Sequence, residues 1–331
     1  MTSIYGPVEH GLICGYLFPR GGQGVPIDLA QAKRWLEQPS DDGFVWLHFS
    51  LTDASAERWI QTNLPVPPEY FVALHEGSRS TRIEDAQDAL IAVVNDVAYE
   101  FSFDPSQIAS LWVCVTSRMA ISTRVQPLKS IDTLRRAVND GAVFASSVAL
   151  LNHLMHDQGD VLVRIVREAT LKVDAIEDGL VHGRLKHQRS DLGQLRRVLV
   201  RLQRLLAPEP AALFRLLRQP PPWVQPHDLD EMRQATEEFS MVIRDMSALQ
   251  ERIKLLQEEM AARVGEQTNK TLFTLTMVTV LALPINIVTG FFGMNVGGVP
   301  LADSPYGFLT MVLIVVVFTG VAAWLAFRRR D

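Results

Sequence analysis

The polar residues best placed to bind an ion lie near the end of the chain, between two apolar stretches. The segment TGFFGMNVGGVP, residues 289–300, puts the amide of Asn295 after Gly293 and Met294 and before two further glycines and a proline. Amide oxygens can accept hydrogen bonds from the water shell of a cation without stripping that shell. A turn between two helices accounts for the same composition, because glycine and proline favour turns. The neighbouring segments have to decide between these two interpretations.

The two apolar segments are long enough to cross a membrane. Residues 272–294 and 307–327 each match the thickness of the hydrocarbon core, and neither contains a charged residue or a histidine. Three arginines follow the second segment in the tail 328–331, whereas the loop 295–306 carries Asp303 and no basic residue. The positive-inside rule therefore predicts two transmembrane helices, with both termini in the cytoplasm and the loop on the periplasmic side.

The first apolar segment carries polar side chains at helical spacing, and the second is almost entirely apolar. Steps of three and four residues define one helix face, made by Asn269, Leu272, Thr276, Thr279, Leu283, Asn286 and Gly290. Polar side chains on a membrane helix face protein or water rather than lipid. Threonine and asparagine also form hydrogen bonds between packed membrane helices, which is the alternative interpretation of this face.

A water path through the membrane requires several copies of the chain. Two helices cannot enclose such a path, because each has a single neighbour and most of its surface still faces lipid. In a ring of chains, the first segment would line a central pore and the second would shield that pore from lipid. Asn295 of each copy would then contribute to a ring of amide oxygens at the outer end of the pore.

The first half of the chain has the pattern of an α/β domain, over residues 1–157. Four β-rich runs predict strands, and these are GFVWLHFS, DALIAVVNDVAYEF, ASLWVCVTS and RMAISTRV. Three amphipathic runs predict helices, and these are LAQAKRWLEQ, SAERWIQTNL and SIDTLRRAVND. The N-terminal sequence MTSIYGPVEH lacks the basic flank and apolar core of a secretory signal, so we expect this domain in the cytoplasm.

Long helices are expected between this domain and the membrane. Residues 158–227 form a predicted helical region, with a helix from about Gly159 to Leu206 whose second half is rich in arginine and lysine. The basic stretch 184–204 is typical of a solvated helix face, and it also suits a contact with acidic side chains. Residues 228–271 predict a stalk that continues into the first membrane segment, with an apolar stripe made by Phe239, Val242, Met246, Leu249, Ile253, Leu256 and Met260. We expect this stripe to hold neighbouring chains together below the membrane.

Several other functions leave no signature in the sequence. Cys14 and Cys114 lie in apolar strand-like runs, where buried structural thiols are usual, and no cluster of His and Cys of the kind that grips bare zinc is present. His153 and His156 are close enough to share a helix face, as surface residues or as a regulatory metal site.

A formal net charge of −5 and the absence of a nucleic-acid motif argue against nucleic-acid binding. No nucleotide loop, hydrolase spacing or nucleophile elbow indicates an enzyme.

A membrane-tethered sensor is the remaining rival to a pore. In such a protein the apolar segments only anchor the α/β domain, so replacing Asn295 or Thr279 would leave function unchanged. The polar face of the first segment argues against that interpretation, because a simple anchor has no need of it.

The tripeptide Gly293-Met294-Asn295, together with the order of stalk, span, short loop, span and basic tail, resembles the CorA superfamily of divalent-cation transporters. The resemblance covers essentially the whole chain, and the run ALHEGSRSTRIEDAQDALIAVVNDV is similar to the soluble domain of the ZntB branch. The loop sequence VGGVP also resembles that branch and lacks the acidic MPEL-like sequence common in the magnesium branch. Met294 instead matches the magnesium form of the tripeptide, where ZntB members often carry another apolar residue.

The resemblance implies a homopentamer with a funnel-shaped cytoplasmic domain in a bacterial inner membrane. It implies zinc uptake assisted by a proton gradient, with a magnesium or cobalt channel and zinc efflux as alternatives, and no cofactor besides the transported ion. Neither span contains a titratable side chain, so a proton relay would use water or the nearest acidic residues, which are Asp303, Glu258, Glu259 and Glu266. These residues would also attract cations, although the three glutamates suit the charged flanks of a coiled coil equally well.

Overall fold

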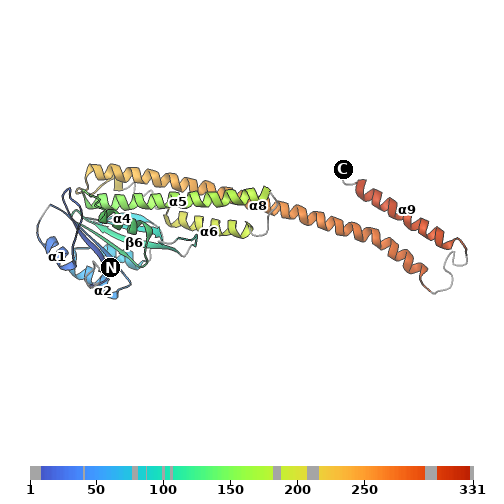
Figure 1. Cartoon of the computed structure of the whole chain (residues 1–331), viewed down its shortest axis with the longest axis horizontal. Coiled ribbons are helices and arrows are strands. Elements are labelled where there is room, and N and C mark those ends of the chain that lie inside the picture. Colours follow the sequence, from blue (N-terminus) through green and yellow to red (C-terminus); the bar gives the residue numbers. More distant parts are fainter. Residues whose placement is uncertain are drawn as a thin grey trace. The chain divides into compact units, whose positions relative to one another are not determined.

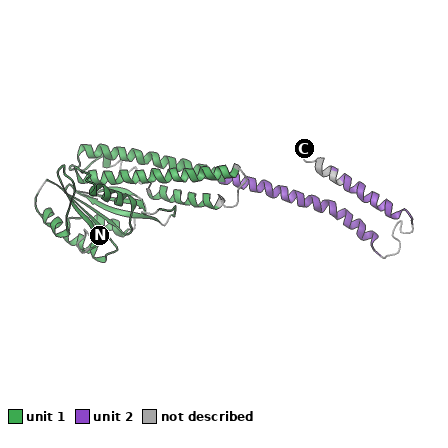
Figure 2. Ribbon diagram, viewed as in Figure 1, with its two compact units in different colours: residues 1–256 green, residues 257–331 purple. Residues whose placement is uncertain are grey.

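The computed structural model describes residues 9–39, 42–76, 81–86, 88–98, 101–104, 107–181, 188–206, 216–294 and 304–328. The chain divides into two compact units, Met1–Leu256 and Gln257–Asp331 (Figure 2). One long helix ends unit 1 and begins unit 2.

Unit 1 is built on a sheet whose described strands follow the order β2-β1-β3-β7-β6-β5-β4. The strands are β1 (Leu12–Pro19), β2 (Val25–Pro26), β3 (Gly43–Ser50), β4 (Arg82–Ala86), β5 (Ala89–Val97), β6 (Ile108–Val115) and β7 (Met119–Arg124). The pairing of β3 with β7 is parallel, and the other described pairings are antiparallel. The predicted run GFVWLHFS coincides with β3, and two other predicted strands contain β5 and β7. The run ASLWVCVTS covers all of β6 except its first residue, Ile108.

Helices cover both faces of this sheet. On one face lie α1 (Leu29–Glu37), α2 (Ala54–Asn63) and α3 (Pro68–His75), and on the other lie α4 (Lys129–Asn139) and part of α5 (Ser147–Val181) (Figure 1). The side chains of β3 alternate, so Val45 and Leu47 join the core under the first three helices while Trp46 faces the other way. All of β5 is buried, as expected for a strand covered on both faces.

Among the described residues, α5 and α6 (Gln188–Leu206) occupy the region where one helix from about Gly159 to Leu206 was expected. Helix α5 begins at Ser147, so the expected domain boundary after residue 157 falls inside this helix. The hydroxyl of Ser146 accepts a hydrogen bond from the amide of Ala149 at 2.9 Å and so caps the first turn. Helix α6 (Gln188–Leu206) buries Leu195 and Leu202 and exposes four arginines, which are Arg196, Arg197, Arg201 and Arg204. In the single chain these arginines lie on the exposed face of the helix.

Helix α8 (Pro226–Phe292) runs for 67 residues, and its first part packs within unit 1. The predicted apolar stripe is buried there, with Phe239, Met246 and Ile253 each at most 3% exposed. Arg252 of α8 forms an ion pair with Asp174 of α5 at 2.7 Å, which fixes the two helices side by side (Figure 1). The expectation that this stripe joins neighbouring chains is therefore wrong for its part in unit 1, because α5 and α6 of the same chain already cover it. Periodicity identified the buried face but not the helices that bury it.

Candidate ion pathway

The predicted pore face lies on the part of α8 that belongs to unit 2. This part contains an apolar window long enough to cross a membrane, and no residue of that window is buried. The seven residues of the face are all exposed in the single chain, with Leu272 at 54% and Leu283 at 56%. Because apolar side chains at this exposure are unstable in water, lipid or other copies of the chain must cover them.

The threonine hydroxyls of this helix already have hydrogen-bond acceptors within the helix. Thr276 donates to the carbonyl oxygen of Leu272 at 2.8 Å, and Thr279 donates to that of Leu275 at 2.9 Å. A hydroxyl has one proton to donate and two lone pairs that accept. With its proton used inside the helix, each threonine oxygen presents only acceptor capacity outwards. This is the polarity that hydration waters of a cation require, because such waters point their hydrogens away from the ion.

Asn286 is the polar side chain furthest along the face within the described residues. It is exposed, and its amide forms no hydrogen bond with any described residue. Two positions earlier, Pro284 lies inside the helix and provides no N–H for the carbonyl of Val280. The middle of the span therefore offers further oxygen acceptors that the helix itself does not satisfy.

The outer end of the pathway is described only in part. Helix α8 ends at Phe292, and the amide of Gly293 donates to the carbonyl oxygen of Thr289 at 2.9 Å. Met294 is 52% exposed. Asn295 and Asp303, which the sequence singled out, lie outside the described residues.

The second apolar helix, α9 (Gly307–Arg328), belongs to the same unit. Among its described side chains the apolar stretch runs over Gly307–Val321. It shares with α8 an apolar cavity of about 290 Å³, lined on the α9 side by Ile314, Val315, Phe318 and Thr319. Leu283 also borders this cavity, so the side chain predicted to face the pore lies near the edge of that face.

The stalk carboxylates are largely neutralised by basic residues one turn away. Glu266 lies 2.7 Å from the ammonium of Lys270, and Glu259 pairs with Arg263. The hydrogen bond from Lys270 lowers the pKa of Glu266 below its usual value, so this carboxylate stays ionised and paired near neutral pH. These contacts favour flanking charges of a solvated helix over a device that attracts cations. Glu258 is exposed on the same helix.

The described residues contain no group of three or more His, Cys, Asp or Glu side chains close enough to hold a metal ion. Both cysteines are free and buried, and burial raises the pKa of each thiol to about 12. They are therefore core residues rather than reactive or metal-binding thiolates. His48 is also buried, with Nδ1 2.8 Å from the hydroxyl of Ser122 and Nε2 accepting from Arg124 at 3.0 Å.

Comparison with known proteins decides the family. The family model described as "CorA-like Mg2+ transporter protein" matches residues 41–329. The chain belongs to the CorA family. Among its relatives, the zinc transport protein ZntB of Pectobacterium atrosepticum is 26% identical over 279 residues, which is 84% of this chain and 85% of that protein. The divalent cation transporter CmaX of Pseudomonas aeruginosa is 29% identical over 330 residues, 97% of this chain and 96% of that protein. The structure of full-length CmaX matches with a TM-score of 0.82 at 27% identity, covering 98% of this chain and 99% of that one.

Membership of the CorA family confirms the resemblance drawn from the GMN tripeptide and the order of elements.

One contact in unit 1, between a histidine of α5 and a glutamate of α8, was not predicted from the sequence. His156 has a carboxylate partner, Glu238 of α8, at 3.1 Å. The spacing of His227, Glu231, Gln234 and Glu238, in steps of four, three and four, was the sequence signal that could have placed these side chains on one helix face.

Proposed function

We propose that this chain assembles as a homopentamer in a bacterial inner membrane and conducts hydrated divalent cations, with zinc as its main cargo. Both α8 and α9 span the membrane, the two termini are cytoplasmic, and the loop between the spans is periplasmic. The observation that carries the proposal is the exposed, uncharged face of α8, on which threonine oxygens and the amide of Asn286 present acceptors outwards. In a ring of five chains these acceptors would surround a common axis.

Selectivity in this proposal comes from hydrogen bonds to the water shell rather than from direct metal ligands. Dehydrating a divalent ion needs strong protein ligands, and neither span contains Asp, Glu, His or Cys. A ring of Asn295 amides would accept hydrogen bonds from the hydrated ion at the periplasmic entrance. The expected consequence is weak discrimination among small divalent cations. Zinc exclusion of magnesium and cobalt by many orders of magnitude would contradict this filter.

Zinc is favoured over magnesium by the relatives. ZntB of Pectobacterium atrosepticum is named a zinc transport protein, and the loop sequence VGGVP resembles that branch. A channel for magnesium or cobalt is the second candidate, because Met294 matches the magnesium form of the tripeptide and the description of the family model names Mg2+. CmaX, at similar identity, is named only a divalent cation transporter.

Flux into liposomes separates these candidates. Purified full-length protein is reconstituted, and initial uptake of Zn2+ is compared with that of Mg2+, each with and without an inward proton gradient. Zinc uptake that rises with external acidity supports proton-assisted zinc import, and the proton then travels through water or by way of Asp303, since the spans have no titratable side chain. Magnesium uptake that ignores the pH gradient supports the second candidate. Absence of flux for either ion in correctly assembled pentamers would refute transport itself.

A further inference from the structure

Helix α8 carries a second apolar stripe in unit 1, distinct from the buried one. Met241, Ala248 and Leu255 recur at intervals of seven residues, and these three side chains are called the outer stripe below. All three are exposed, Met241 at 55% and Leu255 at 56%. In the sequence the same interval leads from Leu255 through Ala262 to Asn269, where the predicted pore face begins. Large apolar side chains that repeat in this way on a solvated helix indicate a surface that another element covers.

The interval of seven residues indicates what kind of element covers the stripe. A straight α-helix has about 3.6 residues per turn, so positions seven apart drift by about 20° per step around its axis. Over the whole series from Met241 to Gly290 the drift would reach about 140°. Such positions stay on one line of contact when helices wind around one another. The interval therefore favours helices of another copy over a small ligand.

A groove lies beside the outer stripe, between α5 and α8. It has a volume of about 520 Å³, and its apolar lining includes Val163 and Leu171 of α5 and Ala248 of α8. Val163 is 40% exposed and Leu171 is 64% exposed in the single chain. Ala248 belongs to both the groove and the outer stripe. The two features therefore form one continuous apolar surface, of which one half is a ridge and the other a hollow.

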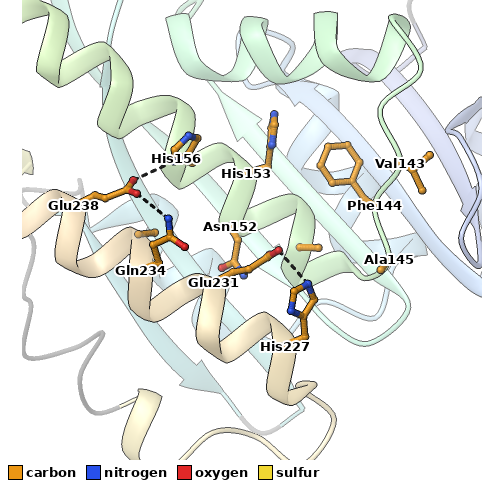
Figure 3. Close-up of a pocket in the computed structure, with 12 residues that line it drawn as sticks. Val143, Phe144, Ala145, Asn152, His153, His156, His227, Glu231, Gln234 and Glu238 are labelled. Atoms are coloured by element: carbon orange, nitrogen blue, oxygen red, sulfur yellow. Dashed lines mark hydrogen bonds and ion pairs between the residues drawn. The ribbon is translucent and has the colours of Figure 1, made fainter.

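Contacts between α5 and α8 fix the two walls of this groove. Nearer the start of α8, Nδ1 of His156 lies 3.1 Å from Oε2 of Glu238 (Figure 3). Further along, Arg252 pairs with Asp174 at 2.7 Å. The two pairs have nearly the same separation in sequence, so the two helices run in the same direction and keep their register. The groove is therefore a fixed feature of unit 1.

We propose that the outer stripe of one copy of the chain packs into the groove of the next copy, head to tail around a ring. A ring needs two different surfaces on each copy, because a surface that contacts itself closes as a dimer. The stripe and the groove are such a pair. The proposal rests on the proposed homopentamer and names the surfaces that join its cytoplasmic domains.

The register of α5 and α8 specifies which side chains would meet. Copies related by a rotation axis that follows α8 stand at equal height. Leu171 stands at the level of Ala248, since both line the groove, and Val163 stands at the level of Val242 for the same reason. The large, exposed Leu171 would therefore meet the small Ala248 of the neighbouring copy, and Val163 would meet its Met241.

Charged side chains border the two surfaces with opposite signs. Arg167 lines the groove and forms no ion pair with any described residue. Glu251 follows Ala248 by three positions on α8, is exposed, and pairs with Lys254 at 3.1 Å. The neighbour's Glu251 can therefore provide Arg167 with a carboxylate. Exposed ion pairs add little affinity, so this pair would set the register of the contact, and the apolar side chains would stabilise it.

Cysteine labelling of the assembled full-length protein in detergent tests whether the groove is covered. Leu171→Cys places a thiol in the groove, and Val200→Cys places one on α6, where Val200 is 46% exposed. Both native cysteines are buried. Leu171 is the more exposed of the two positions in the single chain, yet we expect Leu171→Cys to react about tenfold more slowly with a maleimide, because access controls the reaction. After dissociation into monomers the two should react at similar rates. Fast labelling of assembled Leu171→Cys would overturn the proposal.

Disulfide formation identifies the covering element. Oxidation of the double variant Val163→Cys/Met241→Cys should give covalent oligomers up to the complete ring on a non-reducing gel. Each single variant should stay monomeric, because a head-to-tail contact brings two different positions together. A covalent dimer in either single variant, or monomers alone in the double variant, would overturn the proposal. Slow labelling together with monomers alone would indicate that a different protein covers the groove.

A matched control uses the same groove position. Val163→Cys/Val200→Cys moves the second thiol from the outer stripe to α6 and should give no covalent oligomers. Ladders of equal strength in both double variants would show random collision and refute the contact. All the substituted side chains are exposed, so unfolding temperatures within a few degrees of wild type are expected.

The contact and the proposed function fail separately in these experiments. Pentamers in native mass spectrometry with a freely reactive Leu171→Cys would refute the contact and leave the pentamer standing. A covalent ring from Val163→Cys/Met241→Cys, together with wild-type liposomes that show no flux, would leave the contact standing and refute transport.

Discussion

The hydroxyl of Ser146 lies 2.9 and 2.8 Å from the two carboxylate oxygens of Asp228 and donates to this carboxylate. The contact joins the residue that caps α5 to the first turn of α8. The amide of Asn152 adds a second link, because it donates to the backbone carbonyl of Asp228 at 2.8 Å. The start of α8 is thereby fixed to the α/β domain by polar contacts that are largely shielded from water.

Removing this hydroxyl should destabilise unit 1. Ser146→Ala removes the hydroxyl that donates to the buried carboxylate of Asp228 and removes the cap of α5, so we expect a loss of about 1–3 kcal/mol in unfolding free energy. Thermal unfolding of the full-length protein in detergent measures it. Ser102→Ala, which alters an exposed hydrogen bond to Gln107, is the matched control and should change stability by less than about 0.5 kcal/mol. Equal effects of the two substitutions would contradict a structural role for the contact.

The same contact predicts a dependence on pH. Burial raises the pKa of Asp228 above its usual value, and the hydrogen bond from Ser146 opposes that rise. A raised folded-state pKa means that ionising this carboxyl disfavours the folded state, so its contribution to stability falls as pH rises through that pKa. Without Ser146 the pKa rises further. Ser146→Ala should therefore lower the unfolding temperature more near pH 7 than near pH 4, and an equal loss at both would show that the carboxylate is not involved.

Burial of the two thiols predicts slow modification. Burial raises the pKa of Cys14 and of Cys114 to about 12, so almost no thiolate exists near pH 8. Intact mass after treatment with N-ethylmaleimide should show no adduct on the folded protein and two after denaturation. A cysteine placed at the exposed position of Ser102 should react within minutes and so provides the positive control. Rapid modification of the wild type would indicate that the sheet opens readily.

Much of unit 1 could be predicted because its strands are short apolar runs with clear ends. The run GFVWLHFS matches β3 residue for residue, since Gly43 and Ser50 bound a stretch that is apolar apart from His48. Helix α3 and strand β4 were not predicted. The first is eight residues long and begins with a proline, and the second exposes Glu84 and Asp85 at the edge of the sheet, so neither carries a strong periodic signal.

The partner of a buried face could not be predicted from periodicity. The spacing of Phe239, Met246 and Ile253 correctly indicated a buried stripe, but any apolar surface of suitable shape can cover such a stripe. Here α5 and α6 of the same chain lie beside it, as the ion pair between Arg252 and Asp174 and the hydrogen bond from Gln250 to Gln203 indicate. Among the described residues nothing covers the pore face in this way, and for it the assignment to neighbouring copies stays a prediction.

The threonines of α8 allow a matched test of the pore face. Thr279 lies on this face and Thr274 on the opposite side of the helix, and both hydroxyls donate to the carbonyl four residues earlier at 2.9 Å. Thr279→Val removes an outward acceptor at constant volume and should reduce zinc uptake several-fold. Thr274→Val makes the same chemical change towards lipid and should leave uptake unchanged. Initial rates in liposomes measure both, and equal rates in the two variants would remove the threonines from the pathway.

The amide at the outer end provides a stronger test of the hydrated-ion filter. Asn295→Leu keeps a side chain of similar size but removes its oxygen, so we expect zinc uptake to fall to background while pentamers still form. Native mass spectrometry checks the assembly, and Met294→Leu, which changes only the apolar neighbour, is the control. Normal uptake by assembled Asn295→Leu would exclude the amide ring and favour a simple turn in this segment.

Leu283 is the apolar residue of the pore face that lies between Thr279 and Asn286. A ring of leucines can close a narrow pore by excluding water, which blocks hydrated ions without any charged gate. Leu283→Ala should widen this ring and raise the passive leak of ions down their own concentration gradient, measured without a proton gradient. Leu313→Ala on α9, where the side chain is 61% exposed and is expected to face lipid, makes the same truncation as a control.

Because Leu283 also borders the cavity shared with α9, its truncation will loosen the contact between the two helices as well. The unfolding temperature of the variant separates the two effects. A raised leak with an unchanged unfolding temperature would support a gate at the leucine ring. An unchanged leak with a lower unfolding temperature would place the gate elsewhere and leave Leu283 as a packing residue.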